Sequence, residues 1–233
     1  MKRFYKSVGV AKDAQGYSIQ LDNRPVKTPA KNLLILPRQN LAAAVANEWE
    51  IQGDNIDAPS MRLTRLSNSA IDRITAHRRS VVNEISGFAT TDLVCYRAAE
   101  PETLARRQQE RWDPLVSWIG ARHDVALKVT TGLLPIKQSK RSIQAVHSIV
   151  TSMDDFALSG LHMVTAATGS VVVGLAVADG EIEGTDAWEV SLIDETFQIE
   201  EWGEDSDATE RRANLLADIV AAAEFLYLCK AAE

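Results

Sequence analysis

The first 36 residues of the chain contain several short apolar segments separated by turn residues, and one of these segments alternates hydrophobic and polar residues with the period of a half-buried β-strand. Its apolar residues are Tyr17, Ile19 and Leu21. Asp22 and Asn23 follow directly, and both residue types tolerate the left-handed backbone of a hairpin turn. The pattern predicts a small antiparallel meander, with strands at residues 4–10, 17–21, 24–28 and 33–36.

After Pro37 the apolar residues recur at helical spacing instead. We expect a first helix that ends near Gly53, because glycine favours a helix C-terminal cap. A second helix is expected over residues 63–87. Its apolar positions define one buried face, made of Leu66, Ala70, Ile74, Val81 and Ile85.

The remainder of the chain is predicted to be mostly helical. Residues 92–98 look like a short buried stretch, and residues 126–130 like a brief extended piece. Helices are expected at residues 101–120, 139–153, 154–168, 169–178, 186–202 and 206–230. The predicted fold class is therefore α+β, with a small antiparallel β-rich N-terminal domain at residues 1–90 followed by a mostly helical C-terminal domain at residues 91–233.

Charge and composition exclude several classes of function. The formal net charge is -7 with a pI near 5.2, which argues against nonspecific nucleic-acid binding and against docking on an anionic membrane. Arginines at five positions of the second helix do not share one face at 100° per residue, namely Arg62, Arg65, Arg73, Arg78 and Arg79. We therefore expect neither a nucleic-acid partner nor a membrane partner.

Cysteine usage and the N-terminus indicate the compartment. Cys95 and Cys229 are too few for a disulfide framework and are expected to be reduced, buried thiols. No apolar run approaches the roughly 20 residues that span a bilayer. The N-terminus has no apolar signal core and no Arg/Ser-rich leader. The sequence predicts a cytoplasmic protein of a bacterium, or the mature form of a protein of the mitochondrial matrix.

Motifs that carry chemistry are missing from the sequence. The glycines at 169, 174 and 180 lack the Lys-Ser/Thr pair of a phosphate loop and the spacing of a dinucleotide fingerprint. They are expected to allow close helix packing. The four histidines have no metal-ligand spacing and no adjacent nucleophile. We expect no cofactor, no metal, no small-molecule substrate and no catalytic residue.

An acidic cluster near the C-terminus is the most unusual charged feature. Residues 186–209 contain several carboxylates around Trp202 and no Lys or Arg. Carboxylates so close together repel one another unless basic groups neutralise them. The neutralising charge must come from elsewhere in the fold or from a partner. The cluster is thus either a solvated acidic face or a partner-binding patch.

Several segments, read in order, resemble one family closely. The match extends from residue 3 to about residue 212, and each segment is weak alone while the ordered set is specific. The segments are RFYK at 3–6, LDNRPVKTP at 21–29, EWEIQ at 48–52, MRLT at 61–64, AIDR at 70–73, TDLVCYR at 91–97, QQERWDPLVSW at 108–118, DETFQ at 194–198 and WGED at 202–205. This set resembles the ATP synthase alpha-subunit assembly chaperones of mitochondria and alphaproteobacteria.

The resemblance implies a protein that is not an enzyme. It would bind the unassembled alpha subunit of the F-type ATP synthase head, keep it soluble and hand it over when the beta subunit arrives. No ATP hydrolysis by the chaperone is implied. The partner-binding site is predicted at the acidic motif before the last helix, formed by Glu195, Phe197, Glu201, Trp202, Glu204 and Asp205.

Two other classes remain open at this point. An enzyme would place its site at the interdomain cleft, built from Asp72, Arg73, Asp92 and Arg97. A generic holdase would protect unrelated clients equally well. Neither class has a motif of its own in the sequence.

Overall fold

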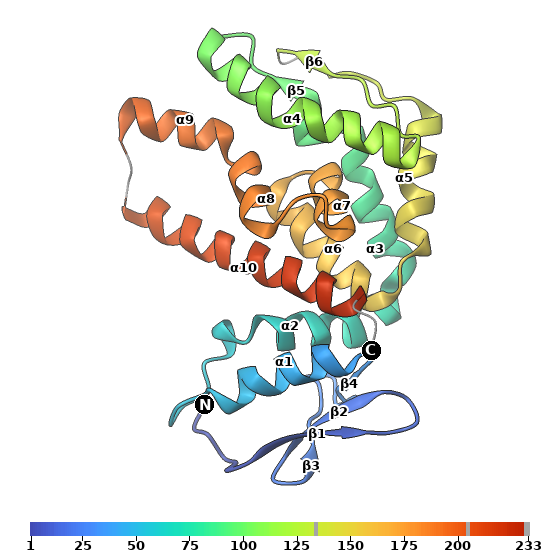
Figure 1. The fold of residues 1–233 in the computed structure, drawn as a ribbon, viewed down its shortest axis with the longest axis vertical. Helices are drawn as coiled ribbons and strands as arrows, with labels where there is room; N and C mark the ends of the chain where they lie inside the picture. The colour runs from blue at the N-terminus through green and yellow to red at the C-terminus, as the bar shows by residue number, and fades with distance from the viewer. Residues whose placement is uncertain (133–134, 204–205, 231–233) are drawn as a thin grey trace.

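A computed structural model describes residues 1–132, 135–203 and 206–230, with the side chains at 206 and 207 left out. A four-stranded sheet near the N-terminus is followed by helices that make up most of the remaining chain (Figure 1). The α+β class predicted from the sequence, with a small antiparallel N-terminal part and a mostly helical C-terminal part, is confirmed. Within the described ranges, every helix is too short or too polar to span a membrane.

The N-terminal sheet is built around its second strand. Strand β2 (Tyr17–Leu21) pairs antiparallel with β1 (Val8–Lys12), with β3 (Arg24–Pro25) and with β4 (Ile35–Leu36). Ile19 on β2 is completely buried. The expected meander is wrong in two details. The first strand begins at Val8, and β4 pairs with β2 and not with the third segment. The third and fourth predicted segments are joined by one isolated bridge, between Lys27 and Leu33.

The turn between β2 and β3 is confirmed at Asp22 and Asn23, whose φ angles are 48° and 63°. The Asp22 carboxylate also accepts hydrogen bonds from the backbone N–H of Lys6 at 3.1 Å and of Ser7 at 2.9 Å. These bonds hold the N-terminal segment against the turn and lower the pKa of Asp22. The turn therefore fixes both the hairpin and the chain that enters it.

Helix α1 (Gln39–Glu50) packs on β1 and β2, and it is joined to helix α2 (Arg62–Ser69) through one side chain. The Glu48 carboxylate accepts hydrogen bonds from the backbone N–H groups of Leu63 and Thr64 and from the Thr64 hydroxyl, all at 2.7 Å. It thereby satisfies orphan donors in the first turn of α2. The predicted cap at Gly53 is wrong, because α1 ends at Glu50 with Ile51 as its C-cap.

The expected helix over residues 63–87 is interrupted. Helix α2 leads into a π-helical turn, η2 (Ala70–Ile74), and then into α3 (Thr75–Gly87), which bends at His77. The predicted buried face is nevertheless confirmed: its members are all at most 5% exposed, namely Leu66, Ala70, Ile74, Val81 and Ile85.

Short elements connect this segment to the helical part. After the 3₁₀ turns η3 (Phe88–Thr90) and η4 (Leu93–Cys95), strand β5 (Tyr96–Arg97) pairs in parallel with β6 (Thr130–Thr131). The expected extended piece at 126–130 thus lies slightly too early in the chain. Between the two strands, helix α4 (Glu102–His123) buries Trp112, whose indole N–H donates to the Val190 carbonyl at 2.7 Å.

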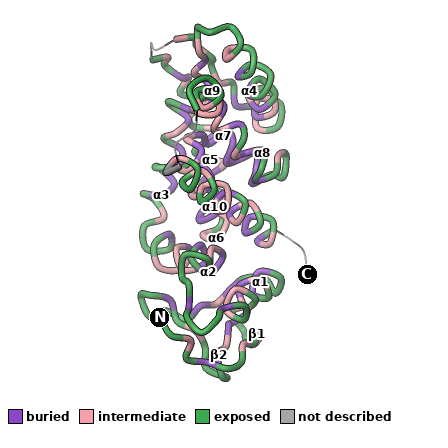
Figure 2. The backbone as a smooth tube through the Cα atoms, turned by 90° about the vertical axis from the view of Figure 1, so that its left-hand side faces the viewer, coloured by how far each residue is buried: buried purple, intermediate pink, exposed green. Residues whose placement is uncertain are grey.

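Six further helices complete the described chain, with α7 at their centre, where residues 171–178 are all buried (Figure 2). The helix expected at 186–202 is in fact two helices, because the backbone turns at Leu192 (φ −109°, ψ 18°). The helices are α5 (Lys140–Ser152), α6 (Asp155–Thr168), α7 (Val171–Asp179), α8 (Gly184–Ser191), α9 (Ile193–Trp202) and α10 (Ser206–Lys230).

Close helix packing through glycine, expected at three positions, is confirmed at Gly174 and wrong at Gly169 and Gly180. These two have no atom of the described residues within 4 Å of a Cβ position, and with φ angles of 68° and 82° they are the C-caps of α6 and α7. A Cβ atom at Gly174 of α7 would lie 2.4 Å from the Thr165 hydroxyl oxygen of α6. A Cβ at Gly160 of α6 would lie 2.7 Å from Leu226 Cγ of α10. Helix α6 therefore packs closely against both α7 and α10 at positions where one of the two helices has a glycine.

Helix α10 connects the two ends of the molecule. It packs on α6 and α8 and also on α2 and α1, and in Figure 1 it lies between the sheet end and the upper helices. Helix α3 likewise packs on α5 and α6. The division into domains at 1–90 and 91–233 stays a prediction, and the helices on either side of residue 90 share one hydrophobic cluster.

Candidate functional site

The acidic motif predicted as a partner site lies on helix α9. This helix is anchored at its first residue, Ile193, which is buried, and at Asp194, whose carboxylate accepts a hydrogen bond from the Gln108 side chain of α4 at 2.6 Å. The rest of the helix is half-buried or exposed (Figure 2). Residues Glu204 and Asp205 of the motif lie outside the described residues. The site can therefore be built only from the part of the motif on α9.

Two carboxylates of α9 are neutralised by arginines of other helices. Glu195 lies 2.8 Å from the Arg211 guanidinium and 3.6 Å from that of Arg212, both on α10. Glu200 lies 2.6 Å from the Arg107 guanidinium on α4. The fold itself thus supplies the charge that the local sequence lacks, and α9 is tied to both neighbouring helices.

Phe197 is covered by one of the same arginines. The Arg107 guanidinium carbon lies 5.5 Å from the centre of the Phe197 ring, within the range of a cation–π contact. The Phe197 side chain is half-buried. This contact makes Phe197 part of the attachment of α9 to α4, while its remaining surface stays accessible.

The end of α9 is different, because its side chains face solvent. Trp202 is 80% exposed and Glu201 is also exposed. An indole ring of this size normally buries much of its surface. An exposed Trp beside a carboxylate, on a helix held in place by ion pairs, can serve as an anchor in a protein–protein contact.

A cavity of about 520 Å³ lies between α4, α8, α9 and the start of α10. Trp188 lines it, with the Arg212 guanidinium carbon 5.1 Å from the ring centre. Arg111 from α4 also lines it and pairs with Glu189 at 2.9 Å. The other two arginines of the lining, Arg107 and Arg212, pair with Glu200 and Glu195 of α9, so the cavity extends the charged surface beside α9.

The residues of the alternative enzyme site are not brought together. Asp72 accepts hydrogen bonds from Thr28, Ala30 and Asn32 of the loop before β4. Arg73, its neighbour, pairs with Glu84.

The other two members are buried in the helical part. Asp92 accepts hydrogen bonds from the Ser170 hydroxyl at 2.5 Å and from the Val172 N–H at 3.1 Å, at the start of α7. Arg97 donates to the Gln108 carbonyl and pairs with Asp113. Each of these groups holds a separate junction of the fold, so the predicted cleft site does not form.

The surroundings of the two cysteines and of two histidines fit a structural role. Cys95 and Cys229 are free and buried, as expected, and burial raises the pKa of each thiol to about 12. His123 and His162 lie 2.9 Å from Asp179 and Glu84. Among the described residues, no group of three or more His, Cys, Asp and Glu side chains is arranged to hold a metal ion.

Comparison with known proteins identifies the family. The model of the ATP12 chaperone protein family matches residues 2–120. The chain belongs to the ATP12 chaperone family. The family resemblance inferred from the sequence motifs is thereby confirmed, and the family is one of chaperones.

Relatives of this ATP12 member come from bacteria and from a mitochondrion. The crystal structure of Atp12 from Paracoccus denitrificans is 38% identical, covers 98% of each chain and superposes with a TM-score of 0.94. The Atu1473 protein of Agrobacterium tumefaciens is 37% identical, covering 98% of this chain and 86% of that chain, with a TM-score of 0.94. The mitochondrial protein atp12 of Schizosaccharomyces pombe is 22% identical over 240 residues, covering 98% of this chain and 82% of that protein.

Sequence reasoning missed the arginines that hold the acidic helix α9. Arg211 and Arg212 follow Glu195 by 16 and 17 positions, whereas Arg107 lies on α4, far from the motif in sequence. The dense carboxylates gave the only signal, because they required neutralising groups somewhere. That requirement did not indicate which arginines would meet it.

Proposed function

We propose that this chain is an assembly chaperone of the F-type ATP synthase that binds the unassembled alpha subunit and keeps it soluble until the beta subunit takes its place. Membership of the ATP12 chaperone family supports the chaperone class. The observation that carries the proposed site is the 80% exposure of Trp202 at the end of α9. The compartment that fits this role is the cytoplasm of a bacterium or the mitochondrial matrix.

The physical need for such a protein follows from subunit assembly. A subunit that will be covered by neighbours on two sides exposes large apolar surfaces while it is alone, and such surfaces promote aggregation. A chaperone that covers one of them must be displaceable. A tighter-binding partner displaces it by mass action, so no nucleotide, cofactor or energy source is required.

Ion pairs divide the acidic motif into two parts. Glu195 and Glu200 contact arginines of the chain itself and orient α9. Glu201 and Trp202 project from the end of the helix. We assign the contact to this end, where the carboxylate would attract a basic client surface and the indole ring would become buried. Glu204 and Asp205 follow after Gly203 in the sequence and are part of the same proposal.

The first experiment measures light scattering of isolated alpha subunit during its dilution from denaturant, with and without this chain. Near-stoichiometric wild-type protein should suppress the scattering. Trp202→Ala and Glu201→Lys should each weaken suppression, and added salt should weaken it further. Tyr227→Ala is the matched control, because Tyr227 is 71% exposed on α10, away from the motif.

Two results would contradict the proposal. Equal suppression of aggregation for the alpha subunit, the beta subunit and an unrelated client would indicate a generic holdase. Loss of suppression in Tyr227→Ala but not in Trp202→Ala would move the contact surface to α10.

A further inference from the structure

A second cavity lies where the N-terminal part meets the helices. It has a volume of about 440 Å³, and its walls come from α2 and η2, from α6, from α10 and from Pro29 in the loop before β4. Its size falls within the range of sites that bind small ligands or side chains. The acidic motif of α9 contributes no residue to it. The cavity is therefore separate from the site assigned above.

Positive charge gathers in this cavity although the chain carries a net charge of -7. The lining contains Arg62, Arg65 and Arg73 against one carboxylate, Asp218, which gives a formal balance of +2 with His162 neutral. Arg62 and Arg65 come from α2 and Arg73 from the π-helical turn that follows it. The five arginines of this segment do not all share one face, but these three line one cavity.

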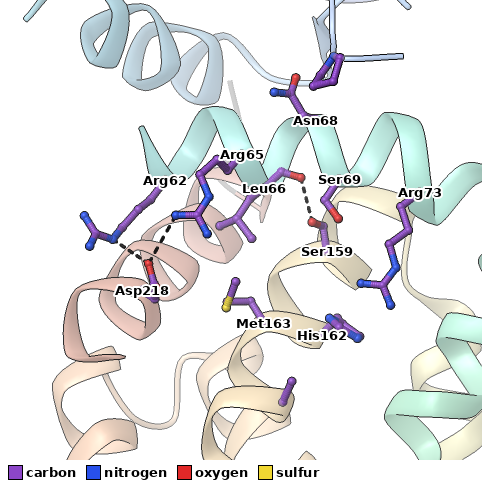
Figure 3. A pocket seen from close by; sticks show the side chains of 12 residues that line it. Arg62, Arg65, Leu66, Asn68, Ser69, Arg73, Ser159, His162, Met163 and Asp218 are labelled. Carbon is purple, nitrogen blue, oxygen red and sulfur yellow. Dashed lines mark hydrogen bonds and ion pairs between the residues drawn. The ribbon is translucent and has the colours of Figure 1, made fainter. Parts of the chain in front are cut away.

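The centre of the cavity is apolar. Figure 3 shows Leu66 and Met163 between two polar ends, with Arg62 and Arg65 converging on Asp218 at one end and Arg73 beside His162 at the other. The Arg62 to Asp218 distance is 2.8 Å and that from Arg65 is 4.0 Å. An occupant must therefore offer an apolar group flanked by negative charge.

The π-helical turn supports a binding role for this wall. Such turns are rare and are frequent at functional sites. Asp72 in this turn binds Thr28 and Asn32 at 2.7 and 2.9 Å, which fixes the loop that carries Pro29 at the rim. The next residue, Arg73, lines the cavity. The π-helical turn thus fixes the rim of the cavity through Asp72 and places the Arg73 guanidinium at the polar end beside His162.

The guanidinium groups remain accessible to an incoming anion. The side chains of Arg65 and Arg73 are 48% and 50% exposed, and Arg73 shares its partner Glu84 with His162. Exposed pairs of this kind are weak, so a competing carboxylate can replace them. Asp218 already pairs with Arg62 and Arg65, so an incoming carboxylate would compete with Asp218 for these arginines.

We propose that this cavity binds an acidic peptide segment of the client, in which carboxylates contact Arg65 and Arg73 and an apolar side chain packs on Leu66 and Met163. The proposal rests on the proposed function only in assigning the segment to the client. A free phosphate would satisfy the arginines but would leave the apolar centre uncovered.

The test uses a fluorescein-labelled peptide of alternating Glu and Leu, with a peptide of alternating Lys and Leu as its counterpart. Fluorescence anisotropy should show saturable binding of the acidic peptide alone. Arg65→Glu and Arg73→Glu should each weaken it about tenfold, as expected for a lost charge pair. Arg79→Glu is the matched control, because Arg79 is exposed on α3 and does not line the cavity. Asp218→Asn should tighten binding.

A second measurement locates the peptide directly. In protein labelled with ¹³C-methyl methionine, the Met163 resonance should shift on peptide addition and should not shift with inorganic phosphate. Arg65→Gln replaces Arg65→Glu if thermal unfolding shows that the latter does not fold.

Three results would overturn the proposal: equal weakening by Arg79→Glu, no saturable peptide binding, or displacement of the peptide by phosphate with the same Met163 shift. Its failure is distinct from that of the proposed function. Peptide binding without capture of the alpha subunit would refute the assigned client and leave the cavity site standing.

Discussion

Removal of the Glu48 carboxylate should destabilise the protein more than removal of any exposed carboxylate nearby. This side chain accepts three hydrogen bonds of 2.7 Å from Leu63 and Thr64 at the start of α2. Hydrogen bonds to a charged group contribute about 1.5–3 kcal/mol each, and loss of an N-terminal cap costs about 0.5–2 kcal/mol. The bonds share one acceptor group, so their contributions do not add fully.

Desolvation reduces this gain. Burial raises the pKa of Glu48 above its ordinary value, which means that the ionised carboxylate is partly removed from water at a cost. We therefore expect a net loss of about 2–3 kcal/mol for Glu48→Ala. Glu48→Gln should lose about 1–2 kcal/mol, because its amide keeps one acceptor oxygen but turns N–H groups toward the donors.

Urea denaturation followed by tryptophan fluorescence measures both changes, with an unchanged slope if the variants remain two-state. The control is Glu50→Gln, whose carboxylate is exposed and lies 3.7 Å from Arg3, a pair worth at most about 1 kcal/mol. If Glu48→Ala and Glu50→Gln lose the same stability, the capping role of Glu48 is refuted.

Three further changes test the fold. Burial raises the pKa of Asp92 from 3.8 to about 6, so wild-type stability should fall by about 3 kcal/mol as the pH rises from about 4 through 6, and Asp92→Asn should remove this slope in urea titrations. The same pH dependence of stability in Asp92→Asn as in the wild type would contradict this prediction. Gly174→Ala should cost about 1–3 kcal/mol through overpacking against Thr165, whereas Gly53→Ala, with open space around it, should be close to neutral in thermal unfolding. In urea titrations, Asn23→Ala should lower the stability by about 1 kcal/mol, because its backbone has a left-handed φ of 63°, whereas Asn23→Gly should not; equal losses would contradict this prediction.

Local patterns predicted those parts of the fold that local physics determines. The hairpin at Asp22 and Asn23 follows from the tolerance of both residues for positive φ. The buried face from Leu66 to Ile85 follows from helical periodicity alone. In both cases the signal lies within a few residues of the structure that it specifies.

Local sequence patterns did not predict the break between α8 and α9 or the contacts between residues far apart in the chain. The break between α8 and α9 falls at Leu192, with neither glycine nor proline to indicate it. The choice of β2 as the partner of β4 depends on packing across the sheet. The same holds for the candidate site, where Glu200 meets Arg107 across 93 positions of the chain. Carboxylate spacing showed that counter-charges were needed, but only the tertiary fold selects them.

The position of α10 affects how the chain acquires its structure during synthesis. Arg62 on α2 pairs with Asp218 on α10 across 156 residues, and α10 also packs on α1 and α6. A ribosome adds about 5–20 residues per second, so α2 waits roughly 8–30 seconds for this partner. During that interval the apolar side of α2 lacks one of its covers. A nascent chain of this chaperone is therefore exposed to the same aggregation hazard as the subunit that we propose it protects.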